Sequence, residues 1–433
     1  MKRYPKYKDS GIEWLGEIPE GWEVKRLKYV AYIDMGQSPD SDYYNKDGTG
    51  VPFLQGNADF KEIYPKPQVW TTEGNKYSKK DDILISVRAP VGEINISDAR
   101  YAIGRGLVAL RFCEKANFKF YYYLFNKAKN YFDSISTGTT YTSVSTDDIK
   151  NIAVVIPPKE HQTAIATFLD QKTTKIDELI KKNEKLIELL KEKRQAVISH
   201  AVTKGLDPNA KMKNSGIEWI GEIPSHWSIR KLKFLSSIKL SGVDKKTLAG
   251  ELPAKLCNYI DVYKNEFISE KLDFMDATAT KNEIAQLTLN KGDVLITKDS
   301  ETPDDIAVPA YVKSEFKNVL CGYHLARVRA NIKYAIGEYL FRLFCAQSIR
   351  EQFTPAANGI TRYGLSKYSI DNSIFPVPTI DEQRMISTFL DQKTAKIDDA
   401  LQKIQSQITT LKEYRQALIS NVVTGKVRIT GEL

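Results

Sequence analysis

Two stretches of the chain carry apolar residues at regular spacing, with charged residues between them and no proline or glycine inside. Each stretch follows a proline-containing segment, runs for about 40 residues and ends near a glycine, Gly205 or Gly425. Such a pattern predicts a long helix with its stop signal. We therefore expect two long helices, at residues 156–205 and 377–433, each roughly 60 Å in length at 1.5 Å per residue.

The apolar positions in both helices recur every seven residues, which is typical of a coiled-coil seam. The seam positions are Leu169, Ile176, Leu190 and Val197 in the first helix, and Leu390, Ile397, Ile404, Leu411 and Leu418 in the second. We expect the two helices to pack on each other as an antiparallel coiled coil. The alternative is that each helix packs on a globular domain.

The chain also contains a long internal repeat. Residues 10–22 recur as residues 215–227 with ten of thirteen positions identical. Residues 163–203 recur as residues 384–424 with 23 of 41 positions identical. Repeated blocks of this length indicate two copies of one architecture rather than a solenoid of short units.

The stretches between the repeated blocks have diverged and keep only a skeleton. The matching segments are residues 82–86 with 293–297, and residues 103–111 with 321–329. Short β-branched and aromatic runs, separated by turn residues, predict mixed α/β modules rather than a doubly wound sheet. Two related domains that recognise different targets would diverge in this way.

These patterns together predict an α+β protein with an internal pseudo-twofold repeat. Two mixed α/β domains are separated and joined by the two long helices. The expected boundaries are a first domain at residues 1–155, a first helix at 156–205, a second domain at 206–376 and a second helix at 377–433.

Composition narrows the class of partner. The formal net charge of +9 favours a polyanionic partner, although a Lys-rich soluble protein would look similar. No signal peptide and no run of about 18 apolar residues is visible. The four cysteines are far apart in sequence and fit reduced thiols. We therefore expect a cytoplasmic protein.

Enzymatic patterns are weak. Asp304 after Pro303, followed by Glu315-Phe316-Lys317, satisfies a loose metal-nuclease pattern that arises by chance in so charged a chain. The four histidines and the dispersed cysteines give no zinc spacing, and no glycine-rich signature for S-adenosylmethionine is present. We predict no catalytic residue, no metal site and no cofactor on this chain.

Motif order points to a known family. The segments Gly16–Trp22 and Gly221–Trp227 both read Gly-Glu-Ile-Pro-x-x-Trp, and each opens a divergent domain that a long helix follows. With Pro157–Gln162 at the start of the first helix, the chain resembles the specificity subunits of type I restriction-modification systems. One departure is His161, where that family usually has glutamate.

The resemblance implies a division of labour. Each target-recognition domain would read one half of a bipartite, asymmetric site in double-stranded DNA. The coiled coil would set the distance between the halves and receive two modification subunits. Those subunits would methylate adenine with S-adenosylmethionine, and restriction subunits would use ATP and Mg to cleave unmethylated DNA.

Candidate DNA contacts come from two glycine-centred polar loops at equivalent positions, from basic residues beside the shared skeleton and from a lysine pair. They are Lys79, Lys80, Arg88, Arg105, Thr139, Thr140, Tyr141, Lys298, His324, Thr361, Arg362 and Tyr363. A polar loop can approach a base edge, and lysines can contact phosphates. The tryptophans that open each domain are interpreted as structural.

Two alternative functions remain at this point. A coiled-coil scaffold would bind protein partners without sequence-dependent DNA affinity. A nuclease would cut DNA alone with magnesium and would lose that activity on Asp304→Ala.

Overall fold

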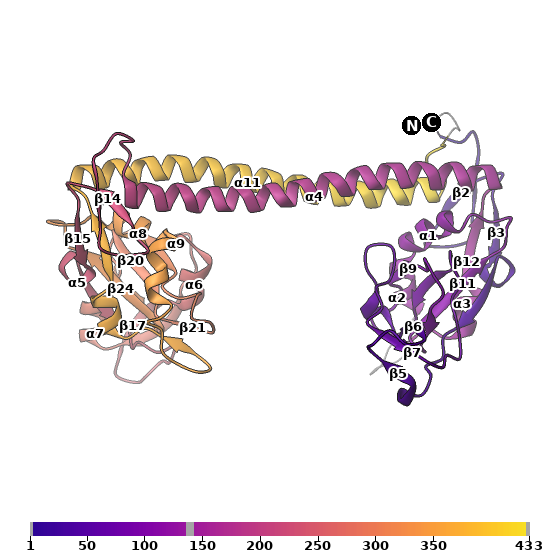
Figure 1. Ribbon diagram of the computed structural model, residues 1–433, viewed down its shortest axis with the longest axis horizontal. Coiled ribbons are helices and arrows are strands. Elements are labelled where there is room, and N and C mark those ends of the chain that lie inside the picture. Colours follow the sequence, from indigo (N-terminus) through magenta and orange to yellow (C-terminus); the bar gives the residue numbers. More distant parts are fainter. Residues whose placement is uncertain (1–2, 136–142, 430–433) are drawn as a thin grey trace. The chain divides into compact units, whose positions relative to one another are not determined.

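The structure is a computed structural model that describes residues 3–135 and 143–429. It divides into two compact units, residues 1–184 with 406–433, and residues 185–405 (Figure 1). Each unit consists of one α/β module and a part of each long helix. In the described residues, no helix is both long enough and apolar enough to cross a membrane.

The two long helices lie close to the expected positions. They are α4 (Lys159–Lys204) and α11 (Ile380–Val423). The second helix ends at Val423, close to the predicted stop at Gly425, and the residues after it in the expected segment 377–433 are not helical as far as residue 429. Gly425 follows with a φ of +74°, the left-handed conformation that commonly ends a helix. A Cβ on Gly425 would lie 2.4 Å from Cδ of Pro19, so the first Gly-Glu-Ile-Pro segment packs against this helix end.

The module of the first unit is built on an antiparallel sheet with the strand order β4-β11-β8-β9. These strands are β4 (Ala31–Met35), β8 (Ile83–Ser86), β9 (Ile94–Ile96) and β11 (Leu107–Phe112). A second sheet has the order β10-β6-β7-β5, with β10 parallel to β6. Its strands are β5 (Tyr44–Asn45), β6 (Val51–Leu54), β7 (Val69–Thr71) and β10 (Ala102–Ile103).

Short elements complete this unit. Strand β1 (Tyr7–Asp9) pairs with β2 (Glu17–Pro19), and β3 (Glu23–Arg26) pairs with β12 (Ala153–Ile156). The helices are α1 (Phe118–Lys127), α2 (Lys129–Ile135) and α3 (Thr146–Asn151), with 3₁₀ turns at Leu27–Tyr29, Ser41–Tyr43 and Asn57–Asp59.

The second unit repeats this plan around a sheet of order β16-β24-β20-β22-β18. The strands are β16 (Ser236–Leu240), β18 (Phe267–Ile268), β20 (Asp293–Thr297), β22 (Pro309–Val312) and β24 (Leu325–Ala330). The second sheet, of order β19-β17-β23, consists of β17 (Leu252–Cys257), β19 (Met275–Ala279) and β23 (Val319–Cys321).

Paired short strands frame the second unit as well. They are β13 (Met212–Asn214) with β14 (Glu222–Pro224), β15 (Ser228–Lys231) with β26 (Ile374–Val377), and β21 (Asp299–Ser300) with β25 (Tyr363–Gly364). The helices are α5 (Leu232–Leu235), α6 (Tyr259–Lys264), α7 (Lys281–Leu287), α8 (Gly337–Cys345), α9 (Gln347–Arg350) and α10 (Lys367–Asp371), with a 3₁₀ turn at Glu351–Phe353.

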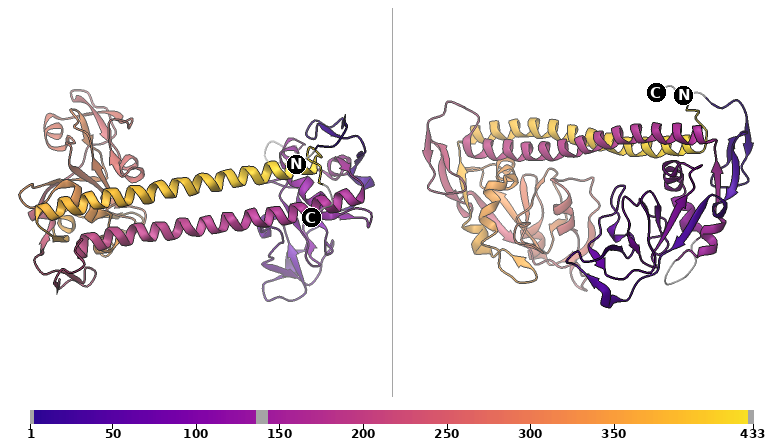
Figure 2. Two further views of the ribbon diagram at one scale, coloured as in Figure 1. Left: turned by 90° about the horizontal axis from the view of Figure 1, so that it is seen from above. Right: turned by 45° about the vertical axis from the view of Figure 1, so that its right-hand side comes forward.

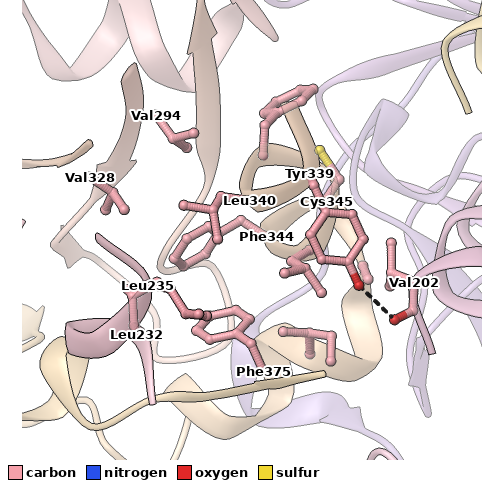
Figure 3. Packing of buried hydrophobic residues seen from close by; sticks show 14 of the residues in the cluster. Val202, Leu232, Leu235, Val294, Val328, Tyr339, Leu340, Phe344, Cys345 and Phe375 are labelled. Carbon is pink, nitrogen blue, oxygen red and sulfur yellow. Dashed lines mark hydrogen bonds between the residues drawn. The ribbon is translucent and has the colours of Figure 1, made fainter. Parts of the chain in front are cut away.

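Both long helices contribute to the core of the second unit. Val202 of α4 lies beside Tyr339 of α8, whose hydroxyl donates to the Val202 carbonyl at 3.4 Å (Figure 3). Leu390 of α11 is fully buried in the same cluster. Leu390 therefore packs on the module, as the alternative interpretation of the helices expected.

The other predicted seam residues are buried to different degrees. Leu169, Ile176, Ile397 and Leu418 are buried, whereas Leu190, Val197, Ile404 and Leu411 are half-buried. Within each unit, one ion pair joins the two helices, which lie side by side there (Figure 2). Asp177 and Arg415 are 2.9 Å apart in the first unit, and Arg194 and Asp398 are 2.8 Å apart in the second.

A buried carboxylate fixes the start of the central strand in each module. Asp82 is 1% exposed, pairs with Arg111 at 2.6 Å and accepts the backbone N–H of Lys79 at 2.7 Å. Asp293, also 1% exposed, holds the guanidinium of Arg329 through two oxygens, each at 2.7 Å. Asp293 also accepts the backbone N–H of residue 290 at 2.9 Å. Each carboxylate thus joins a turn, a central strand and the neighbouring strand.

We predict that Asp293→Ala destabilises the second unit by about 2–4 kcal/mol, because it removes the carboxylate that pairs with the Arg329 guanidinium and leaves a turn amide without its acceptor. Hydrogen exchange of the full chain should then be faster in β20 and β24, and unchanged in β8 and β11. Asp82→Ala is the matched control and should give the reverse pattern. Unchanged exchange in β20 for Asp293→Ala would contradict this role.

Candidate nucleic-acid interface

Both modules have the same backbone arrangement where the central strand ends. In the first unit, the N–H of Val87 donates to the carbonyl of Gly106 at 2.9 Å, and the N–H of Val144 donates to the carbonyl of Val87 at 3.0 Å. In the second unit, the N–H of Lys298 donates to the carbonyl of His324 at 2.9 Å. The N–H of Leu365 completes the match by donating to the Lys298 carbonyl at 2.7 Å.

A glycine makes this arrangement possible in each module. The N–H of Gly104 donates to the carbonyl of Leu54 at 2.8 Å, and the N–H of Gly322 donates to the carbonyl of Cys257 at 2.9 Å. A Cβ on Gly322 would lie 2.7 Å from that carbonyl oxygen, which is closer than real contacts allow. The shared Ile/Cys-Gly dipeptide in the sequence thus marks a close approach of two chain segments.

The predicted residues of the second module form one cluster. His324 is 2.6 Å from Asp299, between Nδ1 and Oδ2, and its Nε2 is 3.5 Å from Nη1 of Arg362. If Nδ1–H donates to the carboxylate, Nε2 is left to accept from the guanidinium. His324 has a φ of +71°, which is uncommon for a residue with a side chain. The result is an oriented chain from a carboxylate through an imidazole to an exposed guanidinium.

Lys298 and two aromatic residues flank this chain. Lys298 is 3.3 Å from Asp299 and lies over the ring of Tyr323, 5.0 Å from its centroid. Tyr323, which is 43% exposed, contacts the His324 ring edge-on. Burial raises the pKa of the nearby Tyr259, and the Asp305 carboxylate adds to this effect. The cluster thus offers two cations, an imidazole and the hydroxyl groups of two tyrosines.

Thr361, Arg362 and Tyr363 lie in a tight hairpin between Asn358 and Gly364. Those two residues exchange backbone hydrogen bonds of 3.0 and 2.8 Å. Thr361 and Arg362 are exposed and Tyr363 is half-buried in β25. The predicted glycine-centred loop of this module is therefore an exposed hairpin beside His324.

In the first module, Arg88 and Arg105 are exposed next to the Val87–Gly106 hydrogen bond, so the structure brings these two candidates together. Lys79 and Lys80 are also exposed, but they precede β8, whereas Arg88 follows it. The lysine pair therefore lies at the opposite end of the strand and does not join the two arginines. Thr139, Thr140 and Tyr141 lie outside the described residues.

Sequence reasoning missed Asp299 and Tyr323. Both could have been found from the repeat, because the shared backbone places Asp299 at the position of Arg88, and Tyr323 at the position of Arg105. Of the four opening tryptophans interpreted as structural, Trp22 and Trp227 are buried at 1% exposure, whereas Trp14 is half-buried and Trp219 is 39% exposed.

Cys321, the cysteine next to this cluster, is not placed to bind a metal ion. Burial raises the pKa of the Cys321 thiol to about 12, and the neighbouring His324 is engaged by Asp299. In the part of the chain that the structure describes, no group of three His, Cys, Asp or Glu side chains is placed to hold a metal ion.

We predict that Gly359→Ala distorts the hairpin, because Gly359 has a φ of +147° and an added Cβ would lie 1.9 Å from the Arg362 carbonyl oxygen. The expected cost is about 1–2 kcal/mol or more of local stability. Faster hydrogen exchange of the Asn358 and Gly364 amides would report it. Gly242→Ala is the control and should be neutral, since its Cβ would meet nothing within 4 Å.

Comparison with known proteins follows the repeat. The family model of the type I restriction modification DNA specificity domain matches the chain twice, at residues 19–189 and 225–410. A Methanocaldococcus jannaschii protein, provisionally named type I restriction enzyme MjaX specificity subunit, is 40% identical over 192 residues. That match spans 44% of this chain and 44% of the relative, less than half of its length.

Other matches span nearly the whole chain. The type I restriction enzyme EcoKI specificity subunit of Escherichia coli K12 is 22% identical, over 95% of this chain and 90% of that protein. The HsdS subunit from Thermoanaerobacter tengcongensis has the same fold, with a TM-score of 0.56 and 17% identity over 95% of this chain and 98% of its own.

A chain from a structure of complex assembly and conformational transition in the type I R-M system is a further structural match. It has a TM-score of 0.73 and 16% identity, over 95% of this chain and 99% of its own. At such identities the structures show a shared fold, while the family model matches well over half of the sequence. The chain belongs to the family of type I restriction modification DNA specificity domains.

Proposed function

We propose that this chain is the subunit of a type I restriction-modification complex that reads DNA sequence. Each module is a target-recognition domain for one half of a bipartite, asymmetric site. The single observation that carries this proposal is the shared backbone at the end of β8 and β20, which presents different side chains in the two modules. A shared backbone with different side chains suits two domains that read different half-sites.

The second module supplies the more complete reading surface. Arg362 is exposed and its guanidinium is oriented by His324, which in turn is held by Asp299. A guanidinium fixed in this way can donate two parallel hydrogen bonds to O6 and N7 of a guanine in the major groove. Lysines outside the cluster, such as Lys79 and Lys80, would add phosphate contacts that carry affinity without sequence information.

The long helices are proposed to form an antiparallel coiled coil that sets the distance between the half-sites. The support is a reciprocal pair of ion pairs. Asp177 and Arg194 of the first helix recur as Asp398 and Arg415 of the second, 221 residues later. Each aspartate pairs with the arginine of the other helix, which is the pattern of an isologous contact. The domain boundaries proposed are 1–155, 156–205, 206–376 and 377–433.

The partners proposed are double-stranded DNA, two modification subunits and the restriction subunits. Methylation with S-adenosylmethionine and cleavage with ATP and Mg would belong to those partners, so this chain is proposed to be non-catalytic and to need no cofactor. The free state of all four cysteines fits the reducing cytoplasm, where such a complex would act.

Co-expression of this chain with its modification subunit should create a new bipartite adenine-methylated motif, detectable by long-read sequencing of the host DNA. Omitting this chain should abolish the motif. A soluble complex that leaves no motif would instead favour a protein scaffold without DNA specificity.

Arg362→Ala should relax recognition at one base pair of one half-site, with a loss of about 1–3 kcal/mol in discrimination there. The other half-site should be unaffected, because it is read by the first module. Lys79→Ala offers a contrast, since a phosphate contact should weaken binding to all sequences alike and reduce its salt dependence. Binding assays with single-base variants of the methylated motif would measure both effects. Undiminished discrimination with Arg362→Ala would remove this residue from the reading surface.

A further inference from the structure

Each module carries an exposed basic–aromatic segment just before β4 or β16. Residues 25–29 read Lys-Arg-Leu-Lys-Tyr, and residues 230–234 read Arg-Lys-Leu-Lys-Phe. The central leucines, Leu27 and Leu232, are fully buried and anchor the segments. The surrounding basic and aromatic side chains are therefore held at the surface in both units.

In the first unit, two cations share one amide oxygen. Arg26 donates to Oδ1 of Asn151 at 2.9 Å, and Lys28 donates to the same atom at 3.3 Å. The asparagine is itself held, because its side-chain amide donates to the carbonyl of Asp147 at 2.8 Å. We call Arg26, Lys28, Tyr29 and Asn151 the first patch.

The second unit repeats this geometry. Lys231 and Lys233 donate to Oδ1 of Asn372 at 3.2 and 3.1 Å, and the asparagine amide donates to the carbonyl of Tyr368 at 3.0 Å. Lys231, Lys233, Phe234 and Asn372 are the second patch. Among residues 3–135 and 143–429, the ion pairs of the structure include none of these four cations, so two like charges in each patch share only a neutral acceptor.

An aromatic ring stands beside the cations in each patch. Tyr29 is 72% exposed and Phe234 is 58% exposed. Lys28 and Lys233 lie over these rings, 5.3 and 5.4 Å from the centroids. A large aromatic side chain left in solvent at the same position of two diverged modules is a feature of interaction surfaces, where aromatic residues often provide much of the binding energy.

The patches lie at the other end of the sheet from Arg105 and His324, and the first patch shares its end with Lys79 and Lys80, which precede β8. Strand β4 begins after Tyr29 and ends next to Gly36, whose N–H donates to the carbonyl of Leu107 beside the Arg105 turn. In the second unit, β16 likewise leads to Ser241, whose N–H donates to Leu325 beside His324. The end of the sheet beside the Arg105 turn or His324 is called the reading end. Five strand residues, roughly 15 Å, separate each patch from it.

We propose that the two patches are equivalent docking sites for an acidic surface on one partner protein, bound once by each module. The identification of that partner as the modification subunit rests on the proposed function. The paired, uncompensated cations fit carboxylates of the partner, and the exposed ring fits an apolar contact beside them. A partner that binds both modules needs the same chemistry twice. The two patches have the same kinds of side chain, whereas the side chains at the two reading ends differ.

DNA backbone is the other polyanion that both modules would meet. It is less well matched, because phosphate contacts do not call for an exposed ring. The test therefore separates binding of the partner from binding of DNA.

The variants combine Arg26→Glu with Tyr29→Ala in the first patch, and Lys231→Glu with Phe234→Ala in the second. Native mass spectrometry with the modification subunit should give two partners for the unaltered chain, one for either single-patch variant and none for the variant of both patches. Partner affinity at an altered patch should fall by roughly thirtyfold or more. Lys46→Glu with Lys245→Glu, an exposed pair with the same charge change as the two glutamate substitutions, is the control and should keep both partners.

Two partners bound to the variant of both patches would overturn the proposal. So would variants that keep both partners but lose affinity for DNA with a shallower salt dependence, because the patches would then be phosphate contacts. Circular dichroism and target binding by the chain alone verify that the variants are folded. An unaltered chain that gives no methylated motif and binds no modification subunit would overturn the proposed function itself, and this inference with it.

Discussion

The buried carboxylate at the start of each central strand is the interaction on which both modules depend. Asp82 and Asp293 each close a turn through a backbone N–H, and each holds an arginine of the neighbouring strand. A carboxylate that is 1% exposed is costly to bury without partners, so the turn and both strands must form together. This requirement fixes the register of β8 on β11 and of β20 on β24, and hence the position where each central strand ends.

Because the frame is fixed by backbone hydrogen bonds and by this ion pair, the side chains at the strand end are free to differ. The carbonyl that accepts from Val87 belongs to Gly106, while the one that accepts from Lys298 belongs to His324. The same frame therefore supports two exposed arginines in one module, and in the other an aspartate, an imidazole and a guanidinium. Under the proposed function, a change of sequence specificity requires new side chains but no new fold.

The sequence predicted much of this architecture, and the exceptions have physical causes. Heptad spacing and the repeat located both long helices, because periodicity and helix-breaking residues are local signals. The packing of Leu390 in a module core, rather than in a helix seam, depends on distant residues such as those of α8, so its heptad position could not show it. The repeat points to Arg362 and to His324 through two different aligned segments. Their link through Asp299 is a tertiary contact, which the alignment could not show. Lys79 and Lys80 are grouped with Arg88 and Arg105 only because of their charge. They lie at the other end of β8, which the sequence could not show.

The two ends of β4 and β16 differ in what they preserve. At the reading end the backbone is the same and the side chains have changed; at the patch end the cations, the shared asparagine and the aromatic ring are all kept. Folding alone explains the buried Leu27 and Leu232, but it does not require an exposed ring that is 72% or 58% accessible. A surface that stays alike after duplication, next to one that has diverged, implies two ligands of different kinds. One ligand differs between the modules, as half-sites do, and the other is the same for both, as a partner present in two copies would be.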